Sequence, residues 1–186
     1  MRKNIITVYP EVYAIICIAL LLLPLKLAVA WLFSVVFHEL SHWLAIKLTG
    51  GHVNRISIKF SGIQMHTNPL SDFQELICAA AGPIGGLLLF FISYKHIPLL
   101  AVFSLLHGLY NLIPLFPLDG GRVVRNLFAV IFKERYPGKL NFIFDTSVSL
   151  FLLAFVILGM LRFPIGPVPL VMVLIMIFNN KKLKYS

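Results

Sequence analysis

The sequence predicts an all-α, polytopic membrane protein of six transmembrane helices, with a small β-hairpin between the second and third helices. Two properties of the composition predict this class: 59% of the 186 residues are hydrophobic and only 12% are charged, and the mean hydropathy is +0.91. Soluble domains hold about 45–50% apolar and about 25% charged residues, so a soluble globular domain is excluded. A helical span takes roughly 20 residues, so six spans and their loops use nearly the whole chain.

The apolar segments of the sequence mark where these spans are expected. The last two segments are short, and we expect flanking residues to complete them. In chain order the segments are Val8–Leu25, Leu27–Leu48, Leu76–Tyr94, Ile97–Leu118, Thr146–Leu161 and Phe163–Phe178. Residues 1–186 are therefore expected to form one integral-membrane domain, with no separate soluble domain.

The distribution of basic residues predicts the orientation of the chain. The net charge is +9, from 16 Lys and Arg against 7 Asp and Glu. Because Lys and Arg accumulate in cytoplasmic loops, this excess is read as a topology signal rather than as nucleic-acid binding. All Lys and Arg residues except Lys26, Lys95 and Arg162 lie in the two termini or in loops on the same side of the membrane as the termini. We expect a multi-pass protein of the cell membrane with both termini in the cytoplasm and no nucleic-acid partner.

Residues 1–30 allow a second interpretation, a cleaved signal peptide. Arg2 and Lys3 precede an apolar stretch that ends in Ala28-Val29-Ala30, a small-residue pattern of the type found at cleavage sites. Cleavage there would leave an odd number of crossings and would remove the charge asymmetry between the loops. A first membrane span agrees better with the rest of the chain.

Two segments between the spans have periodic patterns of their own. From Val53 to Met65, hydrophobic and polar residues alternate around Ser61-Gly62, which predicts a β-hairpin. From Gly120 to Phe132, hydrophobic residues recur at helical spacing with Arg and Asn between them. This second pattern predicts an amphipathic helix near the cytoplasmic interface.

The second apolar segment contains His38-Glu39-Leu40-Ser41-His42. Residues four apart on a helix lie on one face, about 6 Å apart along the axis, so both imidazoles can reach one ion. Neutral imidazole suits zinc, and Glu39 is placed to activate a water at the ion. Such residues are costly in lipid and rare unless they serve a site. A polar cluster that only links helices is the alternative.

Catalytic zinc usually takes three protein ligands, so a third ligand is needed. The candidates are the few carboxylates together with His52, His66, His96 and His107. Asp119 is favoured, because Pro114 and Pro117 break the helix before it and broken backbone at membrane depth is tolerated only where it lines a cavity or is buried. The alternative is that Asp119 only caps the helix that follows it.

Together these patterns resemble the site-2 protease family of intramembrane zinc metalloproteases. The resemblance covers roughly residues 30–180 and rests on His38-Glu39-x-x-His42 and on Asn-x-x-Pro-x-x-Pro-Leu-Asp-Gly at Asn111–Gly120. Ala81-Gly82-Pro83 is similar to that family as well. The stretch from Asn111 onward is especially similar to the sporulation branch, whose enzymes release a sigma factor from a membrane-bound precursor.

The resemblance implies a metalloprotease domain with one Zn²⁺ per chain. His38, His42 and Asp119 would hold the ion, and Glu39 would be the general base. Asn111 would orient the substrate or stabilise the oxyanion, the alternative being a hydrogen bond within the bundle. His107 lies one helical turn before Asn111 and is a lesser candidate.

The implied reaction is hydrolysis of a peptide bond within or next to a transmembrane segment of a membrane-bound substrate. Such proteolysis can release a transcription or sigma factor, but we expect no counterpart of the nucleotide-sensing domain of the sporulation branch. The implied partners are that substrate, the lipid bilayer and regulatory membrane proteins. The hairpin offers a strand edge for the substrate, the alternative being that it only plugs the site.

Two other functions are compatible with the same residues. A membrane metal-ion transporter would use the same cluster, because buried His and Asp on broken helices also mark ion pathways. A catalytically silent relative is the third interpretation, although all four reacting residues are present.

Overall fold

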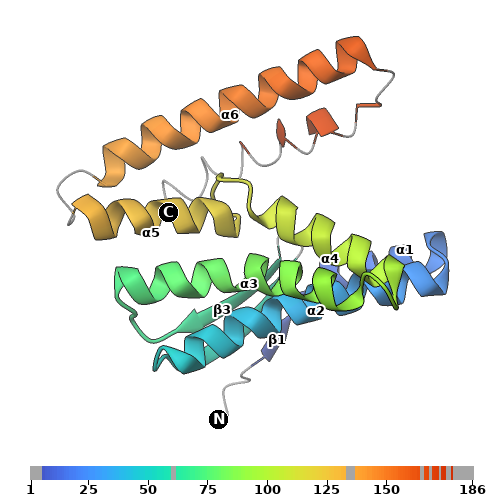
Figure 1. The fold of residues 1–186 in the computed structure, drawn as a ribbon, viewed down its shortest axis with the longest axis horizontal. Helices are drawn as coiled ribbons and strands as arrows, with labels where there is room; N and C mark the ends of the chain where they lie inside the picture. The colour runs from blue at the N-terminus through green and yellow to red at the C-terminus, as the bar shows by residue number, and fades with distance from the viewer. Residues whose placement is uncertain are drawn as a thin grey trace. The chain divides into compact units, whose positions relative to one another are not determined.

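The computed structural model describes residues 6–59, 62–132, 137–163, 166–167, 169–171, 173–174 and 177 (Figure 1). The chain divides into two compact units, Met1–Asn111 and Leu112–Ser186. Helices predominate in both.

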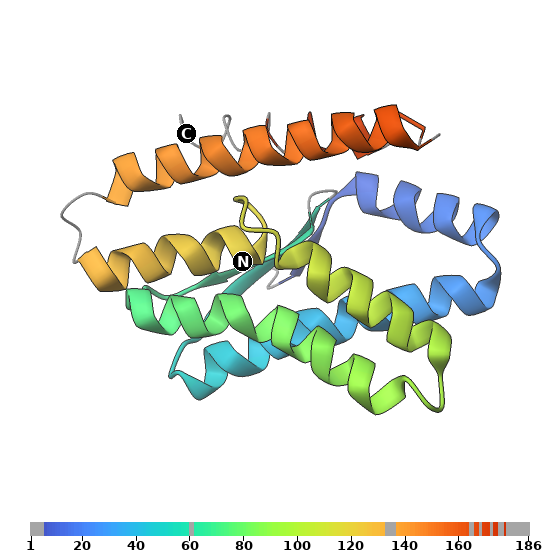
Figure 2. The same ribbon diagram turned by 45° about the horizontal axis from the view of Figure 1, so that its top comes forward.

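The first unit contains four helices and a three-stranded sheet among its described residues. Its elements are β1 (Ile6–Val8), α1 (Pro10–Leu22), α2 (Leu25–Leu48), β2 (Val53–Lys59), β3 (Gly62–Thr67), α3 (Asp72–Ser93) and α4 (Pro98–Asn111). The helices α2, α3 and α4 pack against one another in pairs, and α1 contacts α2 and β2 (Figure 2). This three-helix group is the framework of the unit.

The ends and the packing face of α3 follow from its sequence. Ser71 and Gln74 form a capping box, in which the Ser71 hydroxyl accepts from the Gln74 backbone N–H and the Gln74 amide oxygen accepts from the Ser71 N–H. Small residues allow α3 and α4 to approach closely, because a Cβ on Gly86 would lie 3.3 Å from the Cα of Gly108. The middle of α3 is therefore held tightly within the bundle.

The predicted hairpin is present and belongs to a larger sheet. Strands β2 and β3 pair antiparallel, and Gly62 has a φ of +119°, which a glycine adopts at low cost. Its partner in the predicted turn, Ser61, lies outside the described residues. The strand β1 pairs in parallel with β2, which was not predicted, so the order is β1-β2-β3 and β3 has one edge without a strand partner among the described strands.

The second unit contains α5 (Asp119–Phe132) and α6 (Pro137–Arg162), which contact each other. The Phe128 ring of α5 meets the Phe144 ring of α6 edge-on, with centroids 5.7 Å apart. The helix predicted from Gly120 to Phe132 is confirmed and begins one residue earlier.

Three described helices are long and apolar enough to cross a membrane: α2, α3 and the Leu140–Arg162 part of α6. The expected fourth span stops early, since α4 ends at Asn111 rather than at Leu118. The expected fifth span starts earlier than predicted, since α6 begins at Pro137. The sixth, Phe163–Phe178, is described only in part, so the count of six stays a prediction.

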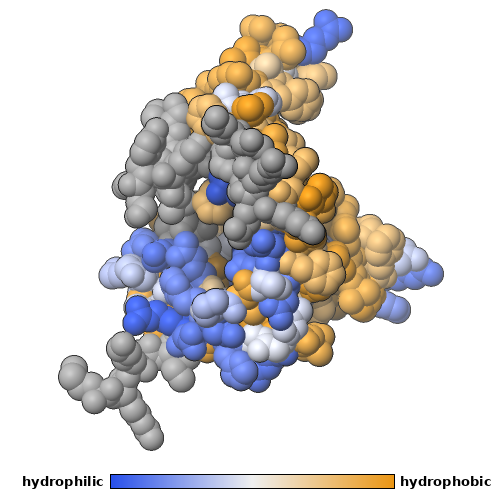
Figure 3. All heavy atoms as spheres, turned by 90° about the vertical axis from the view of Figure 1, so that its left-hand side faces the viewer, coloured by the Kyte–Doolittle hydropathy of each residue, from blue (hydrophilic) through white to orange (hydrophobic). Residues whose placement is uncertain are grey.

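Large hydrophobic side chains are exposed on α1, α2 and α6, as a lipid-facing surface requires. Leu22 is 77% exposed on α1, Leu48 is 78% exposed on α2 and Leu161 is 80% exposed on α6. Hydrophobic side chains, coloured orange, cover much of the surface seen in Figure 3, and the hydrophilic ones gather in separate patches. Exposed apolar area on this scale indicates that the surface faces the lipid of a bilayer rather than water.

Candidate metal centre

His38 and His42 face the interior of the first unit from neighbouring turns of α2. The two side chains are buried, with 2% and 8% of their surface exposed. Their Nε2 atoms lie 3.2 Å apart, and their rings meet edge-on at 79° with centroids 4.8 Å apart. The two imidazoles therefore lie side by side, with their Nε2 atoms close together.

A carbonyl of α3 determines which nitrogen of His42 can bind a metal. His42 Nδ1 lies 2.7 Å from the backbone carbonyl oxygen of Cys78, to which an Nδ1–H donates. In a neutral ring this leaves a lone pair on Nε2, the arrangement found in metal-binding histidines whose other nitrogen is hydrogen-bonded. Two ligands at 2.0–2.1 Å on a tetrahedral zinc lie about 3.3 Å apart, so the Nε2 pair fits that ion.

Gly82 of α3 leaves open the space in front of these two nitrogen atoms. A Cβ at this position would lie 2.2 Å from Nε2 of His42 and 2.5 Å from Nε2 of His38. Real Cβ atoms do not approach other atoms so closely, so any side chain here would displace the imidazoles. Only glycine allows α3 to lie against the histidine pair. The sequence marked Gly82 only through the resemblance of Ala81-Gly82-Pro83, without assigning it this role.

Gly82→Ala is expected to weaken zinc binding by at least the roughly 10- to 100-fold that loss of an outer-shell partner costs. The added methyl group would push both Nε2 atoms away from the ion, and the rings can rotate, so the helices still form. Equilibrium titration with zinc, alongside circular dichroism, measures the effect. Gly166→Ala is the matched control, because a Cβ there would meet no atom within 4 Å. Equal zinc affinity in both variants would contradict this role for Gly82.

α4 brings two further polar residues to the histidine pair. The ring of His107 meets that of His38 edge-on, with centroids 4.6 Å apart. The Asn111 amide nitrogen donates to the backbone carbonyl of His107 at 3.0 Å and lies 3.3 Å from its Nε2. Both contacts lie within α4, so the substrate role of Asn111 and its alternative, a hydrogen bond within the bundle, stay predictions.

The other predicted residues of the first unit lie on α2, on the sheet or beside it, and in the turn before α4. Glu39 is half-buried on α2, between the two histidines in sequence. His66 lies on β3, where its Nε2 is 3.3 Å from the Ser57 hydroxyl, and the backbone N–H of His52 donates to the Asn68 side chain. His96 follows α3 in the turn before α4. Of the four histidines that were candidates for the third ligand, His107 is the one whose ring meets that of His38.

Asp119 belongs to the second unit, where it is the first residue of α5. The break predicted from Pro114 and Pro117 is confirmed, because residues 112–118 between α4 and α5 are not α-helical. Asp119 is buried, with 7% of its surface exposed. Arg122 Nη1 lies 3.4 Å from its Oδ1 and donates to it, which orients the carboxylate.

The two glycines after Asp119 let α5 start against the preceding segment. A Cβ on Gly120 would lie 2.2 Å from the carbonyl oxygen of Leu112, and one on Gly121 would lie 2.3 Å from the backbone nitrogen of Phe116. Backbone hydrogen bonds from Leu118 to Leu115 and from Arg122 to Leu118 close the turn. The turn that carries Asp119 is therefore compact and built from backbone contacts.

Comparison with known proteins bears on both units. Peptidase family M50 matches residues 95–156, which include Asn111 and Asp119. Zinc metalloprotease MJ0392 of Methanocaldococcus jannaschii is 34% identical over 140 residues, which are 68% of this chain and 41% of that protein. A solved structure, the site-2 protease from Methanocaldococcus jannaschii, matches with a TM-score of 0.65 at 23% identity, over 98% of this chain and 92% of that one.

These comparisons support the site-2 protease family that the sequence predicts. The chain has the predicted fold class, a mostly helical membrane protein with a small β-hairpin between its second and third helices. The family does not favour the metal-transporter interpretation. The chain spans 41% of the length of MJ0392, and the sporulation branch stays a prediction.

Proposed function

We propose that this chain is an intramembrane zinc metalloprotease that hydrolyses a peptide bond within or next to a transmembrane segment of another membrane protein. The observation that carries the proposal is the buried pair of Nε2 atoms, 3.2 Å apart, on the same apolar helix as Glu39. A pair of histidines that only linked helices would have no need of a glycine opposite both Nε2 atoms. The match to peptidase family M50 and the zinc metalloprotease relative support the same reaction.

The proposal assigns one Zn²⁺ per chain to His38, His42 and Asp119. Each of these residues offers one ligand atom, an imidazole nitrogen or a carboxylate oxygen, and two nitrogen donors with one oxygen donor suit zinc. Asp119 is buried and its carboxylate is paired with Arg122, which can hold it in the orientation that a metal ligand needs. Three ligands leave a fourth position for water or substrate.

The chain's own residues then perform the proton transfers. Bound zinc would polarise the scissile carbonyl and lower the pKa of the attacking water. Glu39 takes the proton from that water as the new C–O bond forms, and delivers it to the leaving amine nitrogen as the C–N bond breaks. Asn111, on α4, orients the substrate or donates to the oxyanion once its amide turns from His107.

The substrate class follows from the location of the site in an apolar bundle. A transmembrane helix hides its carbonyls in its own hydrogen bonds, so the substrate must unwind locally. The outer edge of β3 can pair with an extended segment by adding a strand, whereas β2 already has partners on both sides. Within this proposal residues 1–186 act as one membrane domain, both termini lie in the cytoplasm, and the site is reached from there.

Reconstituted hydrolysis tests this function. The purified chain in liposomes, together with single-span membrane proteins, is expected to give a shortened product that mass spectrometry locates within or beside the span. Removal of metal with a chelator should stop the reaction, and zinc at one equivalent should restore it. Cleavage that persists in full after metal has been removed would contradict the proposal.

A further inference from the structure

The second unit contains a partly buried ion pair that the proposed chemistry does not use. Nη2 of Arg125 on α5 lies 2.5 Å from Oδ2 of Asp145 on α6. Asp145 is only 7% exposed and lies in the Leu140–Arg162 stretch, which is apolar and long enough to cross a membrane. Ionisable residues in such a stretch are costly and rare, and a buried pair is weak evidence for stability by itself. The pair therefore calls for a role other than holding two helices together.

Arg125 also contacts the segment that leads to Asp119. Its guanidinium carbon lies 3.8 Å from the centroid of the Phe116 ring, which is close cation–π stacking. Phe116 precedes Asp119 by three residues, and the backbone nitrogen of Phe116 lies against Gly121. A planar guanidinium can stack on a ring and bind a carboxylate at the same time, which a lysine cannot do equally well.

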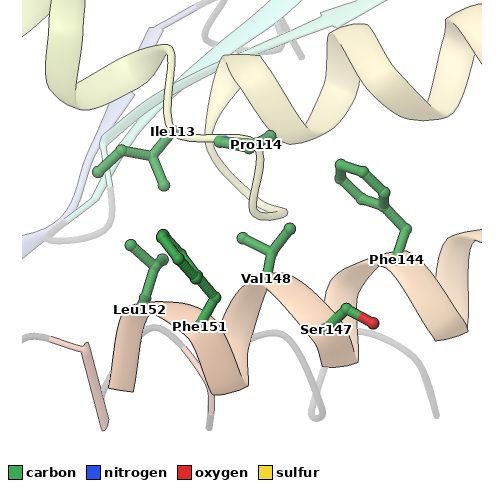
Figure 4. A pocket seen from close by; sticks show the side chains of 7 residues that line it. All are labelled: Ile113, Pro114, Phe144, Ser147, Val148, Phe151 and Leu152. Atoms are coloured by element: carbon green, nitrogen blue, oxygen red, sulfur yellow. The ribbon is translucent and has the colours of Figure 1, made fainter. Parts of the chain in front are cut away.

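Elsewhere the same segment is separated from α6 by a cavity. This cavity has a volume of about 370 Å³, and its lining is almost wholly apolar. In Figure 4, Phe144, Val148 and Phe151 extend from α6 toward Ile113 and Pro114 across the open space. Because side chains do not fill this space, apolar packing alone does not fix the segment against α6. Arg125 supplies a polar connection beside the cavity.

We propose that Arg125 and Asp145 are positioning residues for Asp119. Arg125, held by Asp145, fixes Phe116, and Phe116 fixes the compact turn from which the Asp119 carboxylate projects. We call Phe116, Arg125 and Asp145 the Arg125 latch. The effect of the Arg125 latch on the local backbone is argued from contacts within the second unit alone, whereas its effect on zinc binding rests on the proposed function.

The double variant Arg125→Met with Asp145→Leu tests the latch. It removes both charges and replaces them with apolar groups of similar size, so no unpaired charge stays buried and the helices can form. Arg162→Met is the matched control, since Arg162 is exposed at the end of α6. Phe116→Leu keeps an apolar side chain but removes the aromatic face, and it is expected to give a smaller effect in the same direction.

Two measurements on the full chain in detergent give the result. Amide hydrogen exchange of the metal-free protein should be faster across residues 112–122 in the double variant, by about the tenfold or more that loss of a charged hydrogen bond gives, with α6 beyond Leu152 unchanged. Zinc affinity, measured at a temperature where circular dichroism shows a fully folded protein, should fall by about 10- to 100-fold. Arg162→Met should change neither.

The two readouts separate failure of the latch from failure of the proposed function. Unchanged exchange across residues 112–122 in the double variant overturns the latch, whatever the zinc result. Faster exchange with undiminished zinc affinity overturns the positioning of Asp119 and leaves a purely structural pair. A wild-type chain that binds no zinc defeats the proposed function, while the exchange measurement still decides whether the latch fixes the turn.

Discussion

Glu39→Gln is expected to abolish peptide hydrolysis while zinc stays bound at one equivalent per chain. Glutamine has the same size and shape as glutamate but cannot accept the proton of the attacking water. General acid–base catalysis contributes about 100- to 10,000-fold to a rate, and we expect a loss in this range. His38 and His42 are untouched by the change, so metal binding is preserved. The measurement is the amount of shortened product per unit time in liposomes, with zinc content determined on the same samples.

The matched control is Glu11→Gln, the same substitution at an exposed residue of α1. It should leave both hydrolysis and zinc content at wild-type levels. This experiment also distinguishes a protease from a metal transporter, because a transporter gives Glu39 no special role. Wild-type cleavage by Glu39→Gln would show that Glu39 is not the general base.

Asp119→Ala is expected to remove most of the zinc affinity. Alanine leaves the ion with two imidazole ligands, and the loss should exceed the roughly 10- to 100-fold that removal of an outer-shell partner costs. Hydrolysis should be lost with the metal. The turn itself should persist, because its contacts are made by the backbone and by Gly120 and Gly121.

Competition against a zinc indicator, with the purified chain in detergent, measures this effect. Asp72→Ala is the matched control, since Asp72 is exposed in the first turn of α3. Undiminished zinc affinity in Asp119→Ala would mean that another residue supplies the third ligand. His107, which contacts His38, would then be the first to be tested.

The limits of the helices show what hydropathy can and cannot predict. The fifth span was predicted to begin at Thr146, directly after Asp145, because a carboxylate counts against a membrane segment. In the structure α6 continues back to Pro137, since Arg125 of another helix pairs with that carboxylate. A charge compensated by a residue far away in the sequence cannot be recognised from local hydropathy.

The opposite error occurred where apolar residues continue beyond a helix. The expected span Ile97–Leu118 is apolar throughout, yet α4 ends at Asn111. Pro114 and Pro117 correctly predicted a break in the helix. The hydropathy of residues 112–118 gives no sign of that break, because these residues are as apolar as the helix before them. The strand β1 was missed for a different reason: its three residues pair with a strand far along the chain, and so short a segment shows no periodicity.

The histidine pair could be predicted because helical spacing alone fixes which side chains share a face. The elements that make the pair suitable for a metal could not be predicted, since they depend on how α3 lies against α2. The Cys78 carbonyl selects the His42 tautomer, and Gly82 keeps the space before both Nε2 atoms open. From the sequence alone, a glycine in an apolar helix is interpreted as a residue that allows close helix packing. Only the structure shows that Gly82 lies against the two histidines.

X-ray absorption at the zinc edge of the purified wild-type chain tests the ligand set most directly. The account predicts two imidazole rings and oxygen donors, one of them the Asp119 carboxylate, at about 2.0–2.2 Å from one zinc per chain. The oxygen count should fall in any zinc that Asp119→Ala retains. A spectrum with three imidazole rings, with a sulfur donor, or with no bound zinc would contradict the account.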